Sequence, residues 1–168
     1  MSHVPPALYA TLAEIVPDLH VHCASPWCLI GSTAALLLGA QVSAADVDVL
    51  TSRADADALM AHWAEWRVPV SVAAGSEIFR SHFARFAFPG TPVELMGALE
   101  MHAAGRWQAV TPGRLVLAGL NGLAVPVPCL DDQIRLFESF GREKDLRRAA
   151  VLRALASTAS VPPVVSTH

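Results

Sequence analysis

Charged residues are scarce in this sequence: Asp, Glu, Lys and Arg make up 16% of its 168 residues, and the formal net charge is only −3. A chain with this charge lacks the general excess of positive charge with which many proteins attract nucleic acids. It does not have the composition of a disordered chain either, because 53% of its residues are hydrophobic. We therefore expect a folded chain without a strong signal for nucleic-acid binding.

Long apolar runs and a signal sequence are also missing. No segment approaches the roughly 18 consecutive apolar residues of a membrane-spanning helix, and the first residues lack the basic-then-apolar order of a secretory signal. The three cysteines, Cys23, Cys28 and Cys129, do not have metal-ligand spacing. An odd number of cysteines without an export signal indicates reduced thiols, so we expect a cytoplasmic protein with no membrane partner.

What the sequence does contain is a glycine–serine pair followed by two closely spaced acids. Gly31-Ser32 ends one apolar run, and Asp46 and Asp48 lie in a second one. On a strand, residues i and i+2 point to the same face, so these carboxylates repel each other unless a cation lies between them. Oxygen ligands at this density suit Mg²⁺, while glycine and a serine hydroxyl at a helix start suit a phosphate. Together these residues predict a site for a metal-bound nucleoside triphosphate.

The arrangement resembles the polymerase-beta-like nucleotidyltransferase superfamily. The signature of that superfamily is an apolar strand, Gly-Ser or Gly-Gly, a helix, and Asp-x-Asp on the next strand, with a third acid on a later strand. Glu94, flanked by apolar residues, is the candidate for the third acid, and the resemblance covers about residues 25–97. Near the other end, Lys144-Asp145 is similar to a Lys-Asp element of several small bacterial members. The resemblance implies a small stand-alone nucleotidyltransferase.

The resemblance also implies roles for the three acids. Asp46 and Asp48 would hold two Mg²⁺ ions, for which Mn²⁺ could substitute. Glu94 would complete the metal site, bind the first ion and help to deprotonate the acceptor hydroxyl. An ordinary alternative for Glu94 is a polar residue on the exposed face of a hairpin strand. The implied reaction transfers a nucleoside monophosphate from an NTP, such as ATP, to a hydroxyl group.

Four further residues would bind the nucleotide by the same resemblance. Gly31 and Ser32 would grip the β- and γ-phosphates. Lys144 would neutralise phosphate charge, since lysine acts as a point charge. Asp145 would orient Lys144 or a sugar hydroxyl.

Other basic residues and histidines offer weaker signals. Six of the twelve Lys and Arg residues lie between positions 135 and 153, where they form either a phosphate-facing surface or an ordinary solvated helix face. Arg80, His82 and Arg85 precede the Glu94 strand and could contact the triphosphate or the acceptor, although a structural role suits His82 better. The pair His20 and His22 precedes the first core strand, and we interpret it as incidental.

The acceptor is left open by the sequence. A small hydroxylated molecule, an RNA end and a side chain of a partner protein all fit the implied chemistry, and small members often dimerise to complete the pocket. The alternative to an enzyme is a non-catalytic module of the same fold that binds a nucleotide or a partner, for example in a toxin–antitoxin-type system. Retention of all three candidate acids favours the enzyme.

For the fold we expect the α/β (α+β) class, with a small mixed sheet, helices mainly on one face and C-terminal helices. The expected organisation is a core over 1–130, a helical extension over 131–155 and a flexible tail over 156–168. Apolar periodicity and turn residues predict the individual elements. The expected helices cover 6–16, ending at Pro17, and 32–38, 52–66, 131–140 and 144–155. The expected strands cover 26–30, 47–50, 68–73, 85–88 and 93–96. The segment 119–128 has a mixed pattern, and 125–128 within it is an edge strand or an extended connector.

Overall fold

The computed structural model describes residues 3–71 and 76–159. Its helices are α1 (Pro6–His22), α2 (Gly31–Leu37), α3 (Arg53–His62), α4 (Leu130–Phe140) and α5 (Glu143–Ala159), with a short 3-10 turn at Ala64–Trp66. Its strands are β1 (Cys28–Ile30), β2 (Val47–Thr51), β3 (Arg67–Val68), β4 (Phe79–Phe86), β5 (Val93–Ala103), β6 (Arg106–Ala109), β7 (Leu115–Leu120) and β8 (Leu123–Pro128). None of the helices in these two described ranges is long and apolar enough to cross a membrane.

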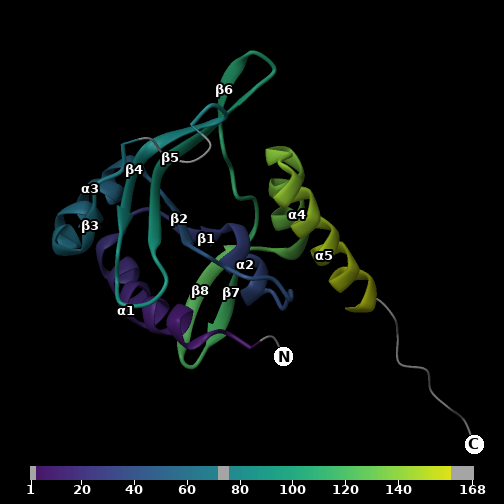
Figure 1. Cartoon of the computed structure of the whole chain (residues 1–168), viewed down its shortest axis with the longest axis horizontal. Coiled ribbons are helices and arrows are strands. Elements are labelled where there is room, and N and C mark those ends of the chain that lie inside the picture. Colours follow the sequence, from purple (N-terminus) through teal and green to yellow (C-terminus); the bar gives the residue numbers. More distant parts are fainter. Residues whose placement is uncertain (1–2, 72–75, 160–168) are drawn as a thin grey trace, which may run out of the picture.

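The main sheet is mixed (Figure 1). Its strand order is β1-β2-β5-β4-β3, and β6 pairs with the far end of β5. Only β2 and β5 pair in parallel among these strands; the other pairs are antiparallel. Strands β7 and β8 form a separate two-stranded sheet. The mixed sheet with its helices confirms the predicted fold class.

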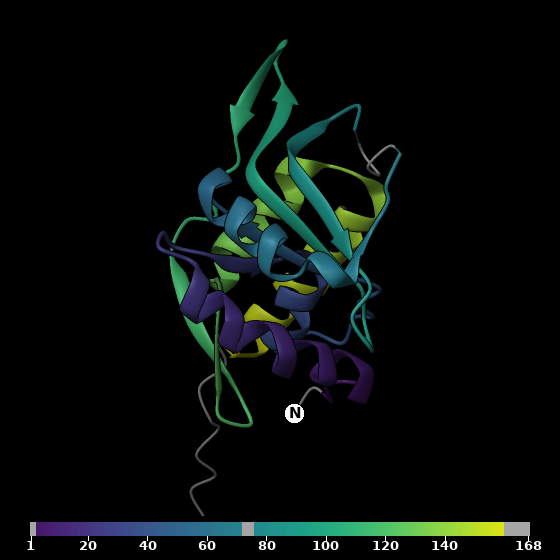
Figure 2. The same ribbon diagram turned by 90° about the vertical axis from the view of Figure 1, so that its left-hand side faces the viewer.

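The two faces of the sheet differ in what covers them. Helices α1 and α3 lie on one face, in front of the sheet in Figure 2, and bury alternate strand residues such as Val47, Val49 and Leu95 in the largest core cluster. On the other face, Ile30 and Leu50 pack with Leu136 of α4 in a smaller cluster. The acids of β2 and β5 lie on this second face, because they alternate with the residues of the large core.

Helix α1 is longer than the sequence predicts. We expected Pro17 to end it, yet the helix continues to His22 with Pro17 inside it. The missing N–H of proline costs one helical hydrogen bond, but Leu19 continues the buried stripe begun by Leu8 and Leu12 and is completely buried. Burial of this stripe offsets the local cost of the proline.

Several strand and helix bounds also differ from the prediction. Strands β4 and β5 are both longer than expected, whereas β3 stops at Val68, where Pro69 removes the next backbone donor. Residues 72–75 of the expected strand 68–73 lie outside the described residues. Helix α5 continues to Ala159, so 156–159 are helical rather than part of a tail, and 160–168 lie outside the described residues.

The segment 119–128 is half of a hairpin that the sequence reading missed. Strands β7 and β8 join through Asn121 and Gly122, whose φ angles of 46° and 85° are the positive values that a tight hairpin turn requires. The Asn-Gly pair was the available signal. Two prolines in β8, Pro126 and Pro128, fit the edge position of a two-stranded sheet.

Candidate active site

One row of paired residues across four strands carries the candidate site. Ile30 on β1 pairs with Asp48 on β2, Asp48 pairs with Glu94 on β5, and Glu94 pairs with Arg85 on β4. Residues paired across a sheet point to the same face. Asp46 lies just before β2, and its carboxylate reaches the same place, because Arg85 bonds to it and to Glu94. The sheet therefore brings Asp46, Asp48 and Glu94 together, as we expected from the sequence.

Arg85 joins two of the acids. Its Nη1 donates to Oε1 of Glu94 at 2.6 Å, and its Nη2 donates to Oδ1 of Asp46 at 3.2 Å. All three side chains are about one-fifth to one-third exposed, so these ion pairs are partly shielded from water. The guanidinium group of Arg85 thus lies beside the acids at which the sequence predicts a metal cation.

Among the three acids, Asp48 has the pKa that is shifted furthest from its ordinary value. Its desolvation in the protein, followed by the nearby negative charges of Glu94 and Asp46, raises its pKa from 3.8 to about 7. Desolvation and the charge of Asp46 also raise the pKa of Glu94. Lys144 lowers both pKa values through its positive charge. Three converging carboxylates that repel one another are a donor set that fits a hard divalent cation.

Gly31 and Ser32 lie at the junction of β1 and α2, directly beside Asp48. Gly31 has a φ angle of 73°, and a Cβ atom there would lie 2.6 Å from Oδ2 of Asp48. Ser32 is buried and lines the same cleft. The hydroxyl of Thr33 donates to the carbonyl of Asp46 at 2.9 Å, which ties α2 to the segment that positions the acids. Glycine at position 31 is therefore required by the approach of Asp48 as well as by its backbone conformation.

Replacement of Gly31 with alanine should destabilise the protein and disturb the acids. The positive φ alone costs an alanine about 1–2 kcal/mol, and the methyl group would push the Asp48 carboxylate away. Denaturant unfolding measures the first effect, and Mg²⁺ titration of the folded variant measures the second. Gly119→Ala is the matched control, because the space around Gly119 is open and its φ is not positive. Equal behaviour of the two variants would contradict the close packing of Gly31 on Asp48.

The acids open into a cleft of about 430 Å³. Its basic lining residues come from β4 and from the C-terminal helices: Arg80, Arg142, Lys144 and Arg148. Lys144 is exposed and faces the acids closely enough to lower their pKa values. The cleft thus has carboxylates at its floor and cationic side chains at its rim. This is the charge pattern that a metal-bound triphosphate requires.

Asp145 makes a different contact from the one expected. Its buried carboxylate accepts hydrogen bonds from Arg142 at 2.6 and 3.2 Å, and the Arg142 guanidinium lies 5.2 Å from the ring centre of Phe79. Asp145 therefore holds Arg142 at the cleft rather than orienting Lys144. A contact of Asp145 with a sugar hydroxyl stays a prediction.

The other basic residues considered in the sequence analysis form ion pairs with nearby acids. Arg147 pairs with Glu143, and Arg153 pairs with Glu138, on exposed surfaces away from the cleft lining. His82 points to the opposite face of β4 from Arg85 and pairs with Asp57 of α3 at 2.6 Å. Arg80 lines the cleft but already pairs with Glu100 at 2.6 Å. The basic residues of α5 thus do not form one uniform face toward the site.

Sequence reasoning did not identify Arg85 as the partner of the acids. The signal was its position: counted back from the turn at Pro89–Pro92, Arg85 lies opposite Glu94 in the antiparallel pair β4–β5. The sequence reading considered Arg85 only as a contact for phosphate or acceptor. Its pairing shows that it holds two of the three acids in place.

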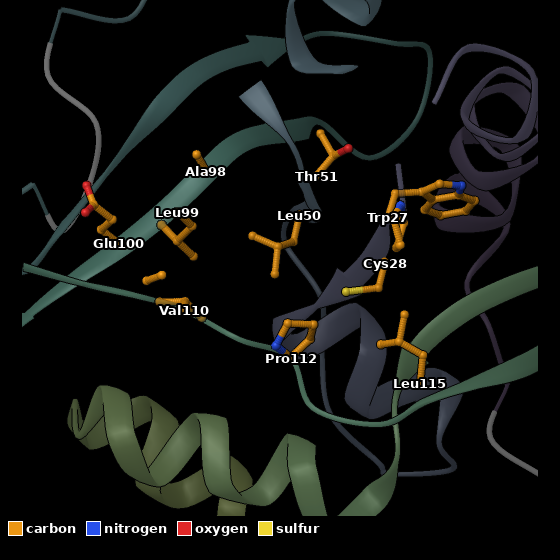
Figure 3. A pocket seen from close by; sticks show the side chains of 12 residues that line it. Trp27, Cys28, Leu50, Thr51, Ala98, Leu99, Glu100, Val110, Pro112 and Leu115 are labelled. Carbon is orange, nitrogen blue, oxygen red and sulfur yellow. The ribbon is translucent and has the colours of Figure 1, made fainter. Parts of the chain in front are cut away.

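A second recess of about 550 Å³ lies along the same sheet face (Figure 3). Cys28 and Leu50 line it, each two residues from a residue of the cleft on the same strand, and Leu99 lines both spaces. Figure 3 shows Trp27, Pro112 and Leu115 at one side of the recess and Glu100 at the other. The recess is mainly apolar, and it was not anticipated from the sequence because its walls come from four distant segments.

Comparisons with known proteins support the fold. Neither protein-family models nor curated proteins match the sequence. Among solved structures, one from Thermotoga maritima described as a "putative nucleotidyltransferase" superposes with a TM-score of 0.70. The match covers 93% of this chain and 97% of that chain at 21% sequence identity. The chain is therefore similar over nearly its whole length to that protein, and it has a nucleotidyltransferase-like fold.

Proposed function

We propose that this protein is a metal-dependent nucleotidyltransferase that moves a nucleoside monophosphate from an NTP to a hydroxyl acceptor, with release of pyrophosphate. The observation that carries the proposal is the convergence of Asp46, Asp48 and Glu94 on one sheet face, beside Gly31 and a cationic rim. Such a cluster of acids is costly to hold together unless a cation shares it. The similar structure from Thermotoga maritima supports the same general kind of protein.

Different residues of the chain would bind the metal, accept the proton and bind the triphosphate. The three acids would hold Mg²⁺, with Mn²⁺ as a substitute, and the bound metal would supply charge stabilisation for the transferring phosphoryl group. Glu94 would help to accept the acceptor's proton, as the resemblance implies, and burial together with the charge of Asp46 raises its pKa above that of an ordinary carboxylate. Lys144 and Arg148 would neutralise the triphosphate from α5, and Ser32 would donate to it from α2.

We propose a small hydroxylated molecule as the acceptor. The apolar recess beside the cleft has a volume in the range of roughly 300–1,000 Å³ that is typical of small-molecule sites. It shares Leu99 with the cleft, so a molecule seated there would adjoin the cleft that contains the acids. An RNA end and a protein side chain remain alternative acceptors, and a homodimer or a partner protein that completes the pocket is a further prediction.

A non-catalytic binding module is the second candidate function. The observation in its favour is Arg85, whose guanidinium already satisfies the carboxylates of Asp46 and Glu94. In an enzyme, the metal would either share these two carboxylates with Arg85, through the oxygens that Arg85 does not contact, or displace it. In a module without catalysis, the ion pairs would persist when a nucleotide or partner binds.

The test is incubation of the protein with Mg²⁺ and each NTP labelled at the α-phosphate, in the presence of metabolite extract, RNA or protein. We expect label to transfer to the metabolite fraction, and transfer should be lost with EDTA. Nucleotide binding without transfer to any fraction would support the binding module. Absence of both Mg²⁺-dependent binding and transfer would overturn the proposed function.

A further inference from the structure

Two histidines and an aspartate gather where α1 meets α3, on the face of the sheet opposite the cleft. Asp18 and His22 are one turn apart on α1, and His62 is the last residue of α3. One ligand atom from each side chain lies within 4.8 Å of the other two. Figure 2 shows the two helices side by side. Sequence analysis did not connect His22 with His62, because 39 residues lie between them.

The distances within this cluster approach those of a metal centre. Nε2 of His62 lies 3.3 Å from Oδ2 of Asp18. Two ligand atoms on a tetrahedral zinc ion, each about 2.0–2.2 Å from it, are about 3.3–3.6 Å apart. The rings of His22 and His62 lie 4.1 Å apart between centres, at 33° to each other. His62 is exposed, so its ring can rotate to bring the remaining ligand atoms to the same spacing.

A neighbouring indole fixes the carboxylate. Nε1 of Trp63 donates to Oδ2 of Asp18 at 2.8 Å. Trp63 is itself held in the core, with edge-to-face contacts to Phe86 and Phe88 at 5.3 and 5.4 Å. Metal-binding carboxylates are usually oriented by such a second hydrogen bond. The cluster therefore has a rigid anchor on one ligand and an adjustable histidine on another.

We propose that Asp18, His22 and His62 bind a divalent transition-metal ion, and that zinc is the metal for which this set is best suited. Two imidazoles with one carboxylate suit zinc, and they leave the fourth position to water. Mg²⁺ prefers oxygen ligands and an octahedral shell, so it should not compete here. The ion would fasten the C-terminal end of α1 to the C-terminal end of α3. This site is separate from the acids of the cleft and does not depend on the proposed reaction.

The test is calorimetric titration of the metal-free, reduced full-length protein with Zn²⁺ in excess Mg²⁺. We expect one saturable site. Zinc at about 100 times its dissociation constant should raise the melting temperature by about 5–10 °C, because it binds only the folded chain. His22→Gln and His62→Gln should each weaken zinc binding by more than the roughly 10–100-fold typical of a lost second-sphere partner.

His20→Gln is the matched control, because His20 lies on the same helix but bonds to the carbonyl of Ala124 instead. It should bind zinc as the unchanged protein does. Zinc binding that survives both His22→Gln and His62→Gln would place the ion elsewhere, for example on a cysteine, and would overturn the proposal. Absence of a saturable site in the unchanged protein would overturn it as well. Circular dichroism of each variant checks that it is folded.

Discussion

Replacement of Asp48 with asparagine should abolish Mg²⁺-dependent nucleotide binding and transfer, while it stabilises the metal-free protein at neutral pH. The carboxylate is the acid nearest the centre of the paired row, between Ile30 and Glu94. Loss of its charge removes a ligand from the proposed metal site. The same change relieves its repulsion with Glu94 and Asp46, the interactions that help to raise its pKa. Function and metal-free stability should therefore change in opposite directions.

The sign of the stability effect follows from the pKa of Asp48. Because its pKa is about 7 in the folded protein, against 3.8 ordinarily, the folded state holds a proton that the unfolded state releases at lower pH. The free energy of unfolding of the metal-free protein should fall as the pH rises from about 4 to about 7. Asp48→Asn should lack this contribution, so that it is more stable by about 1–3 kcal/mol at pH 7.5, since each pKa unit corresponds to about 1.4 kcal/mol and the open cleft screens part of it.

Urea unfolding at pH 5 and pH 7.5, with and without Mg²⁺, measures these effects. The unchanged protein should gain stability from Mg²⁺ at pH 7.5, and Asp48→Asn should not. Glu65→Gln is the control for loss of one negative charge, because Glu65 is exposed on the turn after α3, away from the cleft. Mg²⁺ and nucleotide titrations of Asp48→Asn that match those of the unchanged protein would refute the metal role of Asp48.

The main features of the site could be predicted because they follow from short-range patterns. The spacing of Asp46 and Asp48 fixes their common face once they lie on a strand. The Gly31-Ser32 pair marks the end of β1, and Glu94 lies between buried residues of β5. Ser52 caps α3 and accepts a hydrogen bond from the backbone of Asp55, the contact that a serine at the start of a helix is expected to make. Each of these signals is contained within a few residues.

Other features of the fold and the site depend on contacts between distant segments, which local sequence patterns do not predict. Whether α1 ends at Pro17 is decided by the burial of Leu19, which only the packed fold determines. The side chain of Asp55 accepts hydrogen bonds from the backbone of Ala24 and Ser25, which lie thirty residues or more earlier in the sequence. The partner of Asp145 depended on the choice between two neighbouring basic side chains, Arg142 and Lys144, and the structure selects Arg142. Local propensity does not settle such alternatives, and tertiary packing decides between them.

The second large effect concerns Lys144. If α5 presents it to the triphosphate, Lys144→Ala should weaken nucleotide binding by about 1.5–3 kcal/mol, the range for a hydrogen bond to a charged group. That loss corresponds to about a 10- to 150-fold higher dissociation constant. The physical reason is its position: Lys144 lines the cleft and its charge reaches both Asp48 and Glu94. Nucleotide titration at fixed Mg²⁺ measures the change.

Arg147 and Arg153 provide matched controls on the same helix. Arg147 pairs with exposed Glu143, and Arg153 pairs with Glu138, so neither is directed at the cleft. Arg147→Ala and Arg153→Ala remove the same charge as Lys144→Ala but should change the dissociation constant less than about threefold, since exposed charges are screened by salt. Because a direct phosphate contact is short-range, the loss at Lys144 should persist at high salt. Equal losses at all three positions that vanish together at high salt would instead identify α5 as a diffuse basic surface, and would indicate a nucleic-acid partner.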